Sequence, residues 1–177
     1  NSIDSIAGTI HRGRYRIPPP DAPISGGSPG IATHGPLVGP YLCTVNVVIF
    51  GATGLLGRTL VALAPSGWTV AAYPRRECDI GDRGAVRAAI AAHRPQIVIN
   101  AAAFTNVDAA ESQPAAARRT NALGPGYMAE ACHEAGARLI HVSTDYVFDG
   151  RAAAPYVEDA EPNPLSEYGR SKLGGEQ

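Results

Sequence analysis

The sequence predicts an α/β protein built on a doubly wound parallel sheet, and three observations support this fold class. Short β-branched apolar runs alternate with longer helical stretches from residue 45 onward. A glycine-rich turn follows the first of these runs, and polar residues follow the last. Strands that alternate with helices of about ten or more residues are typical of right-handed βαβ units, whose parallel sheet is covered on both faces.

Residues 1–44 have a different composition and are predicted to form a disordered extension or linker. This segment holds seven prolines and seven glycines, a density typical of low-complexity or disordered chain. Its basic stretch, from His11 to Arg16, is interpreted as a solvated charge run. We therefore place the folded domain at residues 45–177.

The predicted domain opens with a strand, a glycine turn and a helix. Residues 45–50 are an apolar, β-branched run of the kind that parallel sheets bury, and residues 55–64 have a helical pattern. Strands and helices then continue to alternate. We expect further strands at 68–73, 96–100 and 138–142, and further helices at 82–93, at 114–135 and from Ser166 to the C-terminus.

The turn between the first strand and helix has the spacing G-x-x-G-x-x-G, formed by Gly51, Gly54 and Gly57. In a dinucleotide-binding turn the first glycine permits the tight bend, the second lets the backbone approach a pyrophosphate, and the third lets the helix pack on the strand. The N-terminus of that helix then faces the anion. A purely structural turn is the alternative, but the flanking strand and helix favour a dinucleotide site.

The residues after the second predicted strand bear on the choice of cofactor. Folds that prefer NAD place an acid there to bind the ribose 2′-hydroxyl, whereas this sequence has Tyr73 followed by Arg75 and Arg76. Guanidinium groups grip phosphate by charge-assisted, bidentate bonds, so the pattern favours the 2′-phosphate of NADPH. NADH stays open, because both arginines could point into solvent. Asp79 is a candidate contact for the adenine.

The chemistry is expected of Tyr168 and Lys172, which form a Y-x-x-x-K pair. Residues four apart share one face of a helix, and a nearby ammonium lowers the pKa of a tyrosine by favouring the phenolate. A surface tyrosine beside a surface lysine is the alternative. The polar run from Ser143 to Gly150 follows a predicted strand, at the edge where ligands of doubly wound folds bind, so a hydroxyl there could bind a substrate carbonyl.

The segment 100–108 leaves the preceding strand at the same edge of the sheet. Its small alanines would let a nicotinamide ribose pass close to the backbone, although small residues also suit plain packing.

These motifs together resemble the dTDP-4-dehydrorhamnose reductase family of the extended short-chain dehydrogenases/reductases. The likeness covers residues 45–177, and the string S-T-D-Y-V-F-D-G is far more specific than the glycine turn. The other parts are the glycine turn, residues 100–111, the P-Y-x-E and N-P-L motifs at 155–158 and 163–165, and the Y-x-x-x-K motif with the Gly-Glu pair at 175–176.

The resemblance implies a Rossmann fold and the NADPH-dependent reduction of the C4 ketone of dTDP-4-dehydro-L-rhamnose to dTDP-L-rhamnose. It implies Thr144, Tyr168 and Lys172 as catalytic residues, with Thr144 and Asp145 facing the sugar. It also implies cofactor contacts at Gly54, Leu55, Leu56, Asp79, Ile80, Ala102, Ala103 and Thr105. Full-length members of the family can use Mg²⁺ and can form homodimers, and no metal site is visible in this sequence.

Members of the family continue well past the Y-x-x-x-K motif, whereas this chain ends at Gln177. We therefore expect a truncated chain whose sheet is incomplete at its C-terminus. Two alternatives to the reductase stay open. The first is another nucleotide-sugar epimerase or dehydratase, which would keep its cofactor bound and recycle it. The second is a non-catalytic, cofactor-binding regulatory subunit.

Composition argues against several other classes. The chain has 15 Lys and Arg against 16 Asp and Glu, a net charge of −1, which argues against a nucleic-acid binder. No stretch approaches the roughly 18 to 20 apolar residues that cross a bilayer, and no leader pattern opens the chain, so the cytoplasm is the expected compartment. Three distant cysteines and five histidines without ligand spacing predict free thiols and no protein-only metal site.

Overall fold

The structure, a computed structural model, describes residues 44–177. The extension predicted for residues 1–44 lies outside the described residues, apart from Thr44. Within residues 44–177, none of the helices has the length and apolar character needed to span a bilayer.

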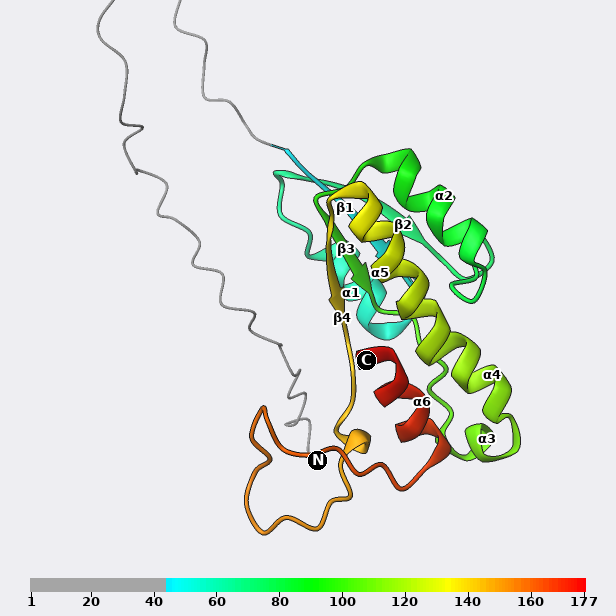
Figure 1. Ribbon diagram of the computed structural model, residues 1–177. Helices are drawn as coiled ribbons and strands as arrows, with labels where there is room; N and C mark the ends of the chain where they lie inside the picture. The colour runs from blue at the N-terminus through cyan, green and yellow to red at the C-terminus, as the bar shows by residue number, and fades with distance from the viewer. Residues whose placement is uncertain (1–43) are drawn as a thin grey trace, which may run out of the picture.

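Four parallel strands of the described chain form one sheet: β1 (Val45–Phe50), β2 (Trp68–Tyr73), β3 (Ile97–Asn100) and β4 (Arg138–His141). Their order across the sheet is β2-β1-β3-β4 (Figure 1). The chain passes from β1 to β2 on one side and then crosses to β3 on the other side of β1. This confirms the predicted doubly wound sheet and places its point of reversal between the carboxyl ends of β1 and β3, where such folds bind ligands.

The register of the sheet brings four residues into one row at its carboxyl edge. Phe50 of β1 pairs with both Tyr73 and Asn100, and Asn100 pairs with His141. Each of these residues is the last of its strand, so the loops that follow all leave the sheet at the same level. The segments predicted to hold the ligand therefore start side by side.

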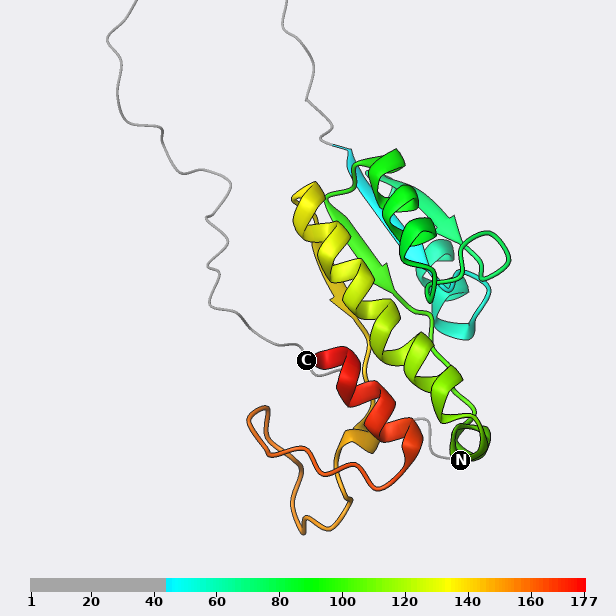
Figure 2. The same cartoon turned by 45° about the vertical axis from the view of Figure 1, so that its right-hand side comes forward.

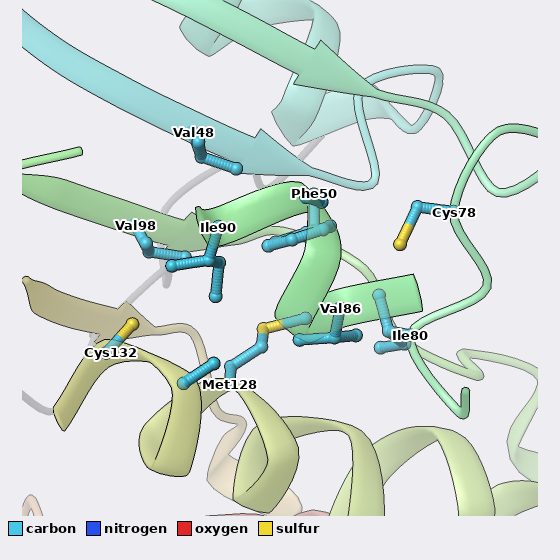
Figure 3. Packing of buried hydrophobic residues seen from close by; sticks show 11 residues of the cluster. Val48, Phe50, Cys78, Ile80, Val86, Ile90, Val98, Met128 and Cys132 are labelled. Carbon is cyan, nitrogen blue, oxygen red and sulfur yellow. The ribbon is translucent and has the colours of Figure 1, made fainter. Parts of the chain in front are cut away.

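Side chains of the central strands alternate between the two faces of the sheet, as strand geometry requires. Val48 and Phe50 point to the face that is covered by α2 (Arg83–His93) and α5 (Gly124–Ala135), where Met128 completes the larger core (Figure 3). These two helices pack side by side along the strands (Figure 2).

The opposite face of the sheet carries a smaller apolar cluster. Val47, Ile49 and Ile99 form it, and Leu60 of α1 (Leu55–Ala62) packs against them. The sheet thus has helices on both faces, as its buried apolar strands predict.

The stretch predicted as one helix at 114–135 is helical throughout but not uniform. It consists of α4 (Pro114–Arg118), a π-helical turn η1 (Arg119–Leu123) and α5. A further helix, α3 (Val107–Ser112), is absent from the sequence prediction; Asn106 caps it by accepting a hydrogen bond from the Ala109 N–H at 2.9 Å.

The last helix, α6 (Glu167–Glu176), begins where the sequence predicts. The Ser166 hydroxyl oxygen caps it by accepting a hydrogen bond from the Gly169 N–H at 3.0 Å. It lies beside α4 and η1, beyond the carboxyl end of β4 (Figure 2). A short 3₁₀ helix, η2 (Asp145–Val147), lies between β4 and α6 in the chain. Every element predicted from the sequence is present in the described residues, with ends shifted by at most two residues.

Candidate active site

The glycine turn after β1 is packed too tightly to carry side chains at two of its positions. Gly51 has a φ of +79°, and a Cβ there would lie 2.5 Å from the backbone nitrogen of Ala102. A Cβ on Gly57 would lie 2.2 Å from the Gly51 carbonyl oxygen. Both distances are far below van der Waals contact, so glycine is required for the bend and for the close approach of α1 to the strand.

The N-terminus of α1 is suited to an anion. Its N-cap, Gly54, provides no side-chain hydrogen bond, and its first turn contains no acidic residue. Free N–H groups and the helix dipole favour negative charge at such an end. Gly54, which precedes the helix, leaves the backbone open toward the neighbouring cavity. The turn therefore fits the pyrophosphate of a dinucleotide.

A cavity of about 510 Å³ lies at the carboxyl edge of the sheet, between the glycine turn, the loops after β2, β3 and β4, and α6. It brings together most of the residues that the sequence analysis assigned to the cofactor. These are Gly51, Gly54, Leu55, Leu56, Arg75, Asp79, Ile80, Ala102, Ala103, Thr105, Tyr168 and Lys172.

Four of the predicted site residues lie outside that wall. Gly57 is buried under the turn, where it lets α1 pack. Arg76 extends into solvent, with a side chain 79% exposed, and pairs with Glu77 at 3.2 Å. Thr144 and Asp145 follow β4 and do not line the cavity, but both lie near Tyr168, which does. Thr144 hydrogen-bonds with the Tyr168 phenol, and the charge of Asp145 acts on it.

The end of β2 carries no carboxylate toward the cavity. The hydroxyl of Tyr73 lies 2.8 Å from Nε2 of His93, and its ring stacks on Phe50 with centroids 5.6 Å apart. Arg75 lines the cavity close by. The first residues after β2 therefore contribute a cation and no carboxylate to the wall.

The Asp79 carboxylate is held in place on the same wall. It accepts hydrogen bonds from the Gly81 N–H at 3.0 Å and from the Arg119 guanidinium at 2.9 Å. The Gly81 N–H is the main cause that lowers the pKa of Asp79, with Arg119 adding to the effect against the opposing effect of burial. The carboxylate is therefore ionised at neutral pH and fixed between the loop after β2 and η1.

Tyr168 and Lys172 both face the cavity from α6, but they do not act on each other as the sequence suggested. Burial raises the pKa of the Tyr168 phenol, and the hydrogen bond with Thr144 partly offsets this rise. Lys172 is not among the groups that shift the pKa of this phenol, so the expected lowering is not seen. The Nζ of Lys172 donates instead to the Val142 carbonyl oxygen at 2.6 Å. The phenol is thus protonated at neutral pH.

Lys172 is almost completely buried, with 2% of its surface exposed. Burial lowers its pKa to about 8, although the charge of Glu176 favours the ammonium. The sequence analysis placed this lysine in the site but gave no sign that it would be withdrawn from water.

Two buried asparagines to which the sequence analysis gave no role of their own contact the segments that form the site. Asn100 accepts the Ala102 N–H at 3.0 Å and so shapes the loop after β3. Asn121, within η1, accepts the Phe104 N–H at 2.8 Å and donates to the Ser171 hydroxyl at 2.9 Å, which joins that loop to α6. In the sequence, the feature that could have pointed to Asn100 is an amide residue at the end of an apolar strand. The corresponding feature for Asn121 is an amide residue inside an alanine-rich helix.

Glu111 of α3 accepts a hydrogen bond from the Glu167 N–H at 2.8 Å and so contributes to the start of α6. Cys78 and Cys132 are buried free thiols, and Cys43 lies outside the described residues. Among residues 44–177 no group of His, Cys, Asp and Glu side chains is arranged to hold a metal ion.

The fold and the cavity define a class: a dinucleotide-binding Rossmann domain of the extended short-chain dehydrogenase/reductase type, with a Tyr and Lys pair on its wall. Comparison with known proteins makes this specific. The chain belongs to the family described as RmlD substrate binding domain, which matches residues 45–177.

The relatives agree with the resemblance stated from the sequence. dTDP-4-dehydrorhamnose reductase of Streptomyces griseus is 47% identical over 131 residues, which cover 73% of this chain and 43% of that protein. The enzyme of the same name from Mycolicibacterium smegmatis is 48% identical over 134 residues, 75% of this chain and 40% of that protein. The chain thus spans less than half the length of these relatives.

Solved structures show the same likeness. The crystal structure of dTDP-4-dehydrorhamnose reductase from Bacillus anthracis in complex with NADP has a TM-score of 0.73 and 37% identity, covering 75% of this chain and 48% of that one. The enzyme from Clostridium acetobutylicum has a TM-score of 0.71 and 41% identity, covering 74% of this chain and 47% of that one.

Proposed function

We propose that this chain is the cofactor-binding part of an NADPH-dependent reductase that converts the C4 ketone of dTDP-4-dehydro-L-rhamnose to the alcohol of dTDP-L-rhamnose. The observation that carries the proposal is that Tyr168 and Lys172 line the same cavity as the glycine turn. Relatives named for this reaction, at 47% and 48% identity, support the choice of substrate.

The cofactor would be held by residues of the described chain. NADPH, when bound, supplies the hydride that reduces the carbonyl carbon. In this proposal the glycine turn and the N-terminus of α1 bind the pyrophosphate, Arg75 binds the 2′-phosphate, and Asp79 and Ile80 lie beside the adenine. The loop after β3 contributes contacts from Ala102, Ala103 and Thr105, and Leu55 and Leu56 add contacts at the start of α1.

The phenol of Tyr168 is the proposed general acid. It donates its proton to the C4 oxygen as hydride adds to the C4 carbon, so that the C=O group becomes CH–OH. Burial raises the pKa of this phenol, so the proton is present at neutral pH. Thr144, which hydrogen-bonds with Tyr168, would bind the same oxygen as negative charge develops, while Asp145 faces the sugar.

Lys172 completes the arrangement as a hydrogen-bond donor beside the cofactor. With a pKa of about 8 it is mostly the ammonium at neutral pH. One of its N–H groups is taken by the Val142 carbonyl, which leaves the others for the nicotinamide ribose.

Replacing the acid tests this function. In a full-length version of the protein, Tyr168→Phe should lower turnover by about 10²- to 10⁴-fold, the usual contribution of a positioned acid, while NADPH affinity is kept. Turnover is followed as the loss of reduced-nicotinamide absorbance with dTDP-4-dehydro-L-rhamnose, and affinity by NADPH fluorescence. Tyr156→Phe is the matched control, because the Tyr156 hydroxyl binds Asp149 in the loop after β4.

Two outcomes would contradict the proposal. Undiminished reduction by Tyr168→Phe would remove the assignment of the acid. Conversion of the sugar without net consumption of NADPH would point to an epimerase that recycles its cofactor.

A further inference from the structure

A row of three polar side chains crosses the buried side of the candidate site. Asn100 ends β3, His141 ends β4 beside it, and Lys172 reaches them from α6. The Asn100 amide nitrogen lies 3.0 Å from Nδ1 of His141, and Nε2 of the same ring lies 3.4 Å from Nζ of Lys172. Asn100 and Lys172 are both fully buried, so each group must be satisfied within the protein.

The backbone fixes which end of the Asn100 amide faces the histidine. The Ala102 N–H can only donate, and it lies 3.0 Å from Oδ1 of Asn100. Oδ1 is therefore the acceptor on that side, and Nδ2 must be the atom that faces His141. Because Nδ2 can only donate, Nδ1 of the ring has to accept. A neutral imidazole with Nδ1 as acceptor carries its proton on Nε2.

The His141 atom that faces Lys172 is consequently a hydrogen-bond donor, Nε2–H, and not an acceptor. Burial and the charge of Lys172 lower the pKa of His141 to about 4, so the ring is neutral near pH 7. Its Nε2–H cannot accept a hydrogen bond from an ammonium, whereas the Val142 carbonyl, 2.6 Å from Nζ, can. Glu176, one turn further along α6, is the carboxylate that favours the ammonium.

Space for this contact comes from a glycine. A Cβ on Gly175 would lie 3.2 Å from Nε2 of His141 and 2.2 Å from the Asn121 carbonyl oxygen. Any side chain there would push α6 away from the end of β4. The helix thus packs closely enough for the histidine to lie against the lysine.

We propose that His141 is a positioning residue for Lys172. Asn100 holds the His141 ring in the Nε2–H form, so the ring offers Lys172 no hydrogen-bond acceptor. The free N–H groups of Nζ therefore turn toward the cavity. The lysine is thereby aimed at the place where the proposed function needs a donor to the nicotinamide ribose. The meaning of this arrangement for catalysis rests on the proposed function, whereas the arrangement itself consists of contacts within the protein.

The tautomer of His141 tests the inference directly. In a long-range ¹H–¹⁵N spectrum of the labelled 177-residue protein at neutral pH, Nδ1 should show the shift of an unprotonated ring nitrogen and Nε2 that of a protonated one. His141→Phe identifies the signals by their loss. An unprotonated Nε2, or a doubly protonated ring, would overturn the proposal.

A second variant should reverse the direction of the hydrogen bonds along this row of side chains. Asn100→Asp replaces the donor to Nδ1 with an acceptor, so the neutral ring should move its proton to Nδ1 and present Nε2 as an acceptor to Lys172. The ammonium then gains a partner, and its titration, followed by the ¹³Cε shift of Lys172, should move upward by about one pKa unit, a tenfold change. Asn106→Asp adds the same charge at an exposed helix cap and should leave both signals unchanged.

The outcomes separate this inference from the proposed function. An Nε2–H tautomer in a protein that fails to bind NADPH would keep the role of His141 and reject the reductase. NADPH binding with the opposite tautomer would keep the reductase and reject the role of His141. An unchanged pKa of Lys172 in a folded Asn100→Asp protein would also overturn the inference. If that variant does not fold, the tautomer of His141 in the unmodified protein decides whether the inference holds.

Discussion

At the scale of single residues, the preference for a cofactor depends on where two adjacent arginines point. The sequence shows Arg75 and Arg76 as equivalent candidates for the 2′-phosphate. Both side chains are exposed, but Arg75 lines the cavity whereas Arg76 lies outside it and pairs with Glu77. An exposed pair of this kind contributes little to stability or binding.

Arg75→Ala should therefore weaken NADPH binding and leave NADH binding nearly unchanged. A hydrogen bond to a charged group is worth about 1.5–3 kcal/mol, which corresponds to roughly ten- to hundredfold in Kd. Fluorescence titration with each nucleotide measures both constants. Arg76→Ala, the neighbouring control, should change neither. Equal losses for the two nucleotides would show that Arg75 does not bind the 2′-phosphate.

His141 gives a stability prediction with a definite sign. Its pKa is lowered from 6.5 to about 4 in the folded chain, by burial first and by Lys172 second. Between these values the unfolded state binds more protons, so the stabilising contribution of the neutral ring is complete above about pH 6.5 and is lost as the pH falls toward 4. Acid should destabilise the protein over this range.

Urea unfolding at several pH values between 7 and about 4 measures this effect. Asp79 also contributes to acid sensitivity, because its pKa is lowered, chiefly by the Gly81 N–H. The difference between the unmodified chain and His141→Phe isolates the imidazole, since the variant retains Asp79. Its stability should fall less steeply with acid. Parallel curves for the two proteins would mean that His141 is not buried in its neutral form.

At the scale of helices and strands, the site depends on irregular features that sequence patterns do not specify. Periodic apolar residues predicted the strands and the long helical stretch, since burial on one or two faces dictates their spacing. The π-helical turn at Arg119–Leu123 instead contains Asn121, which binds the backbone of the loop after β3 and the Ser171 hydroxyl. Those partners are distant in sequence, so no local pattern could reveal them.

Replacing either of two helical glycines with alanine should change the stability of the protein, in opposite directions. A Cβ on Gly175 of α6 would lie 2.2 Å from the Asn121 carbonyl oxygen, whereas a Cβ on Gly126 of α5 would have nothing within 4 Å. Gly175→Ala should lower the melting temperature and displace α6, at a cost of about 1–3 kcal/mol for overpacking. Gly126→Ala should stabilise by roughly 0.5–1 kcal/mol, because alanine loses less conformational freedom in a helix.

Thermal melts of both variants, followed by circular dichroism, test this pair. NADPH affinity should fall in Gly175→Ala alone, because only that change moves the helix that carries Tyr168 and Lys172. A Gly175→Ala protein as stable as the parent would show that α6 can shift without loss.

At the scale of the whole molecule, the sequence predicted the arrangement of the sheet better than the chemistry of its edge. The G-x-x-G-x-x-G spacing and the Y-x-x-x-K pair led to the cavity because both are local motifs. Sequence could not show that Nζ of Lys172 binds the Val142 carbonyl, or that Thr144 reaches the Tyr168 phenol, because both contacts depend on how α6 packs against the end of β4.

The described sheet also predicts how the molecule behaves at high concentration. β4 lies at one edge and pairs only with β3 among the described strands, and Ile140 on it is 50% exposed. A free strand edge with apolar side chains on it favours pairing with another chain. We therefore expect the ligand-free protein to associate reversibly as its concentration rises.

Sedimentation velocity over a wide concentration range measures this association. Ile140→Lys places a charge on the edge strand and should shift the equilibrium to monomer, because charged side chains, lysine above all, protect free edges. Val157→Lys is the matched control: this residue is 60% exposed but lies in the loop between β4 and α6, away from the edge. It should leave association unchanged. A parent protein that stays monomeric throughout, or equal effects of the two lysines, would mean that the β4 edge does not mediate self-association.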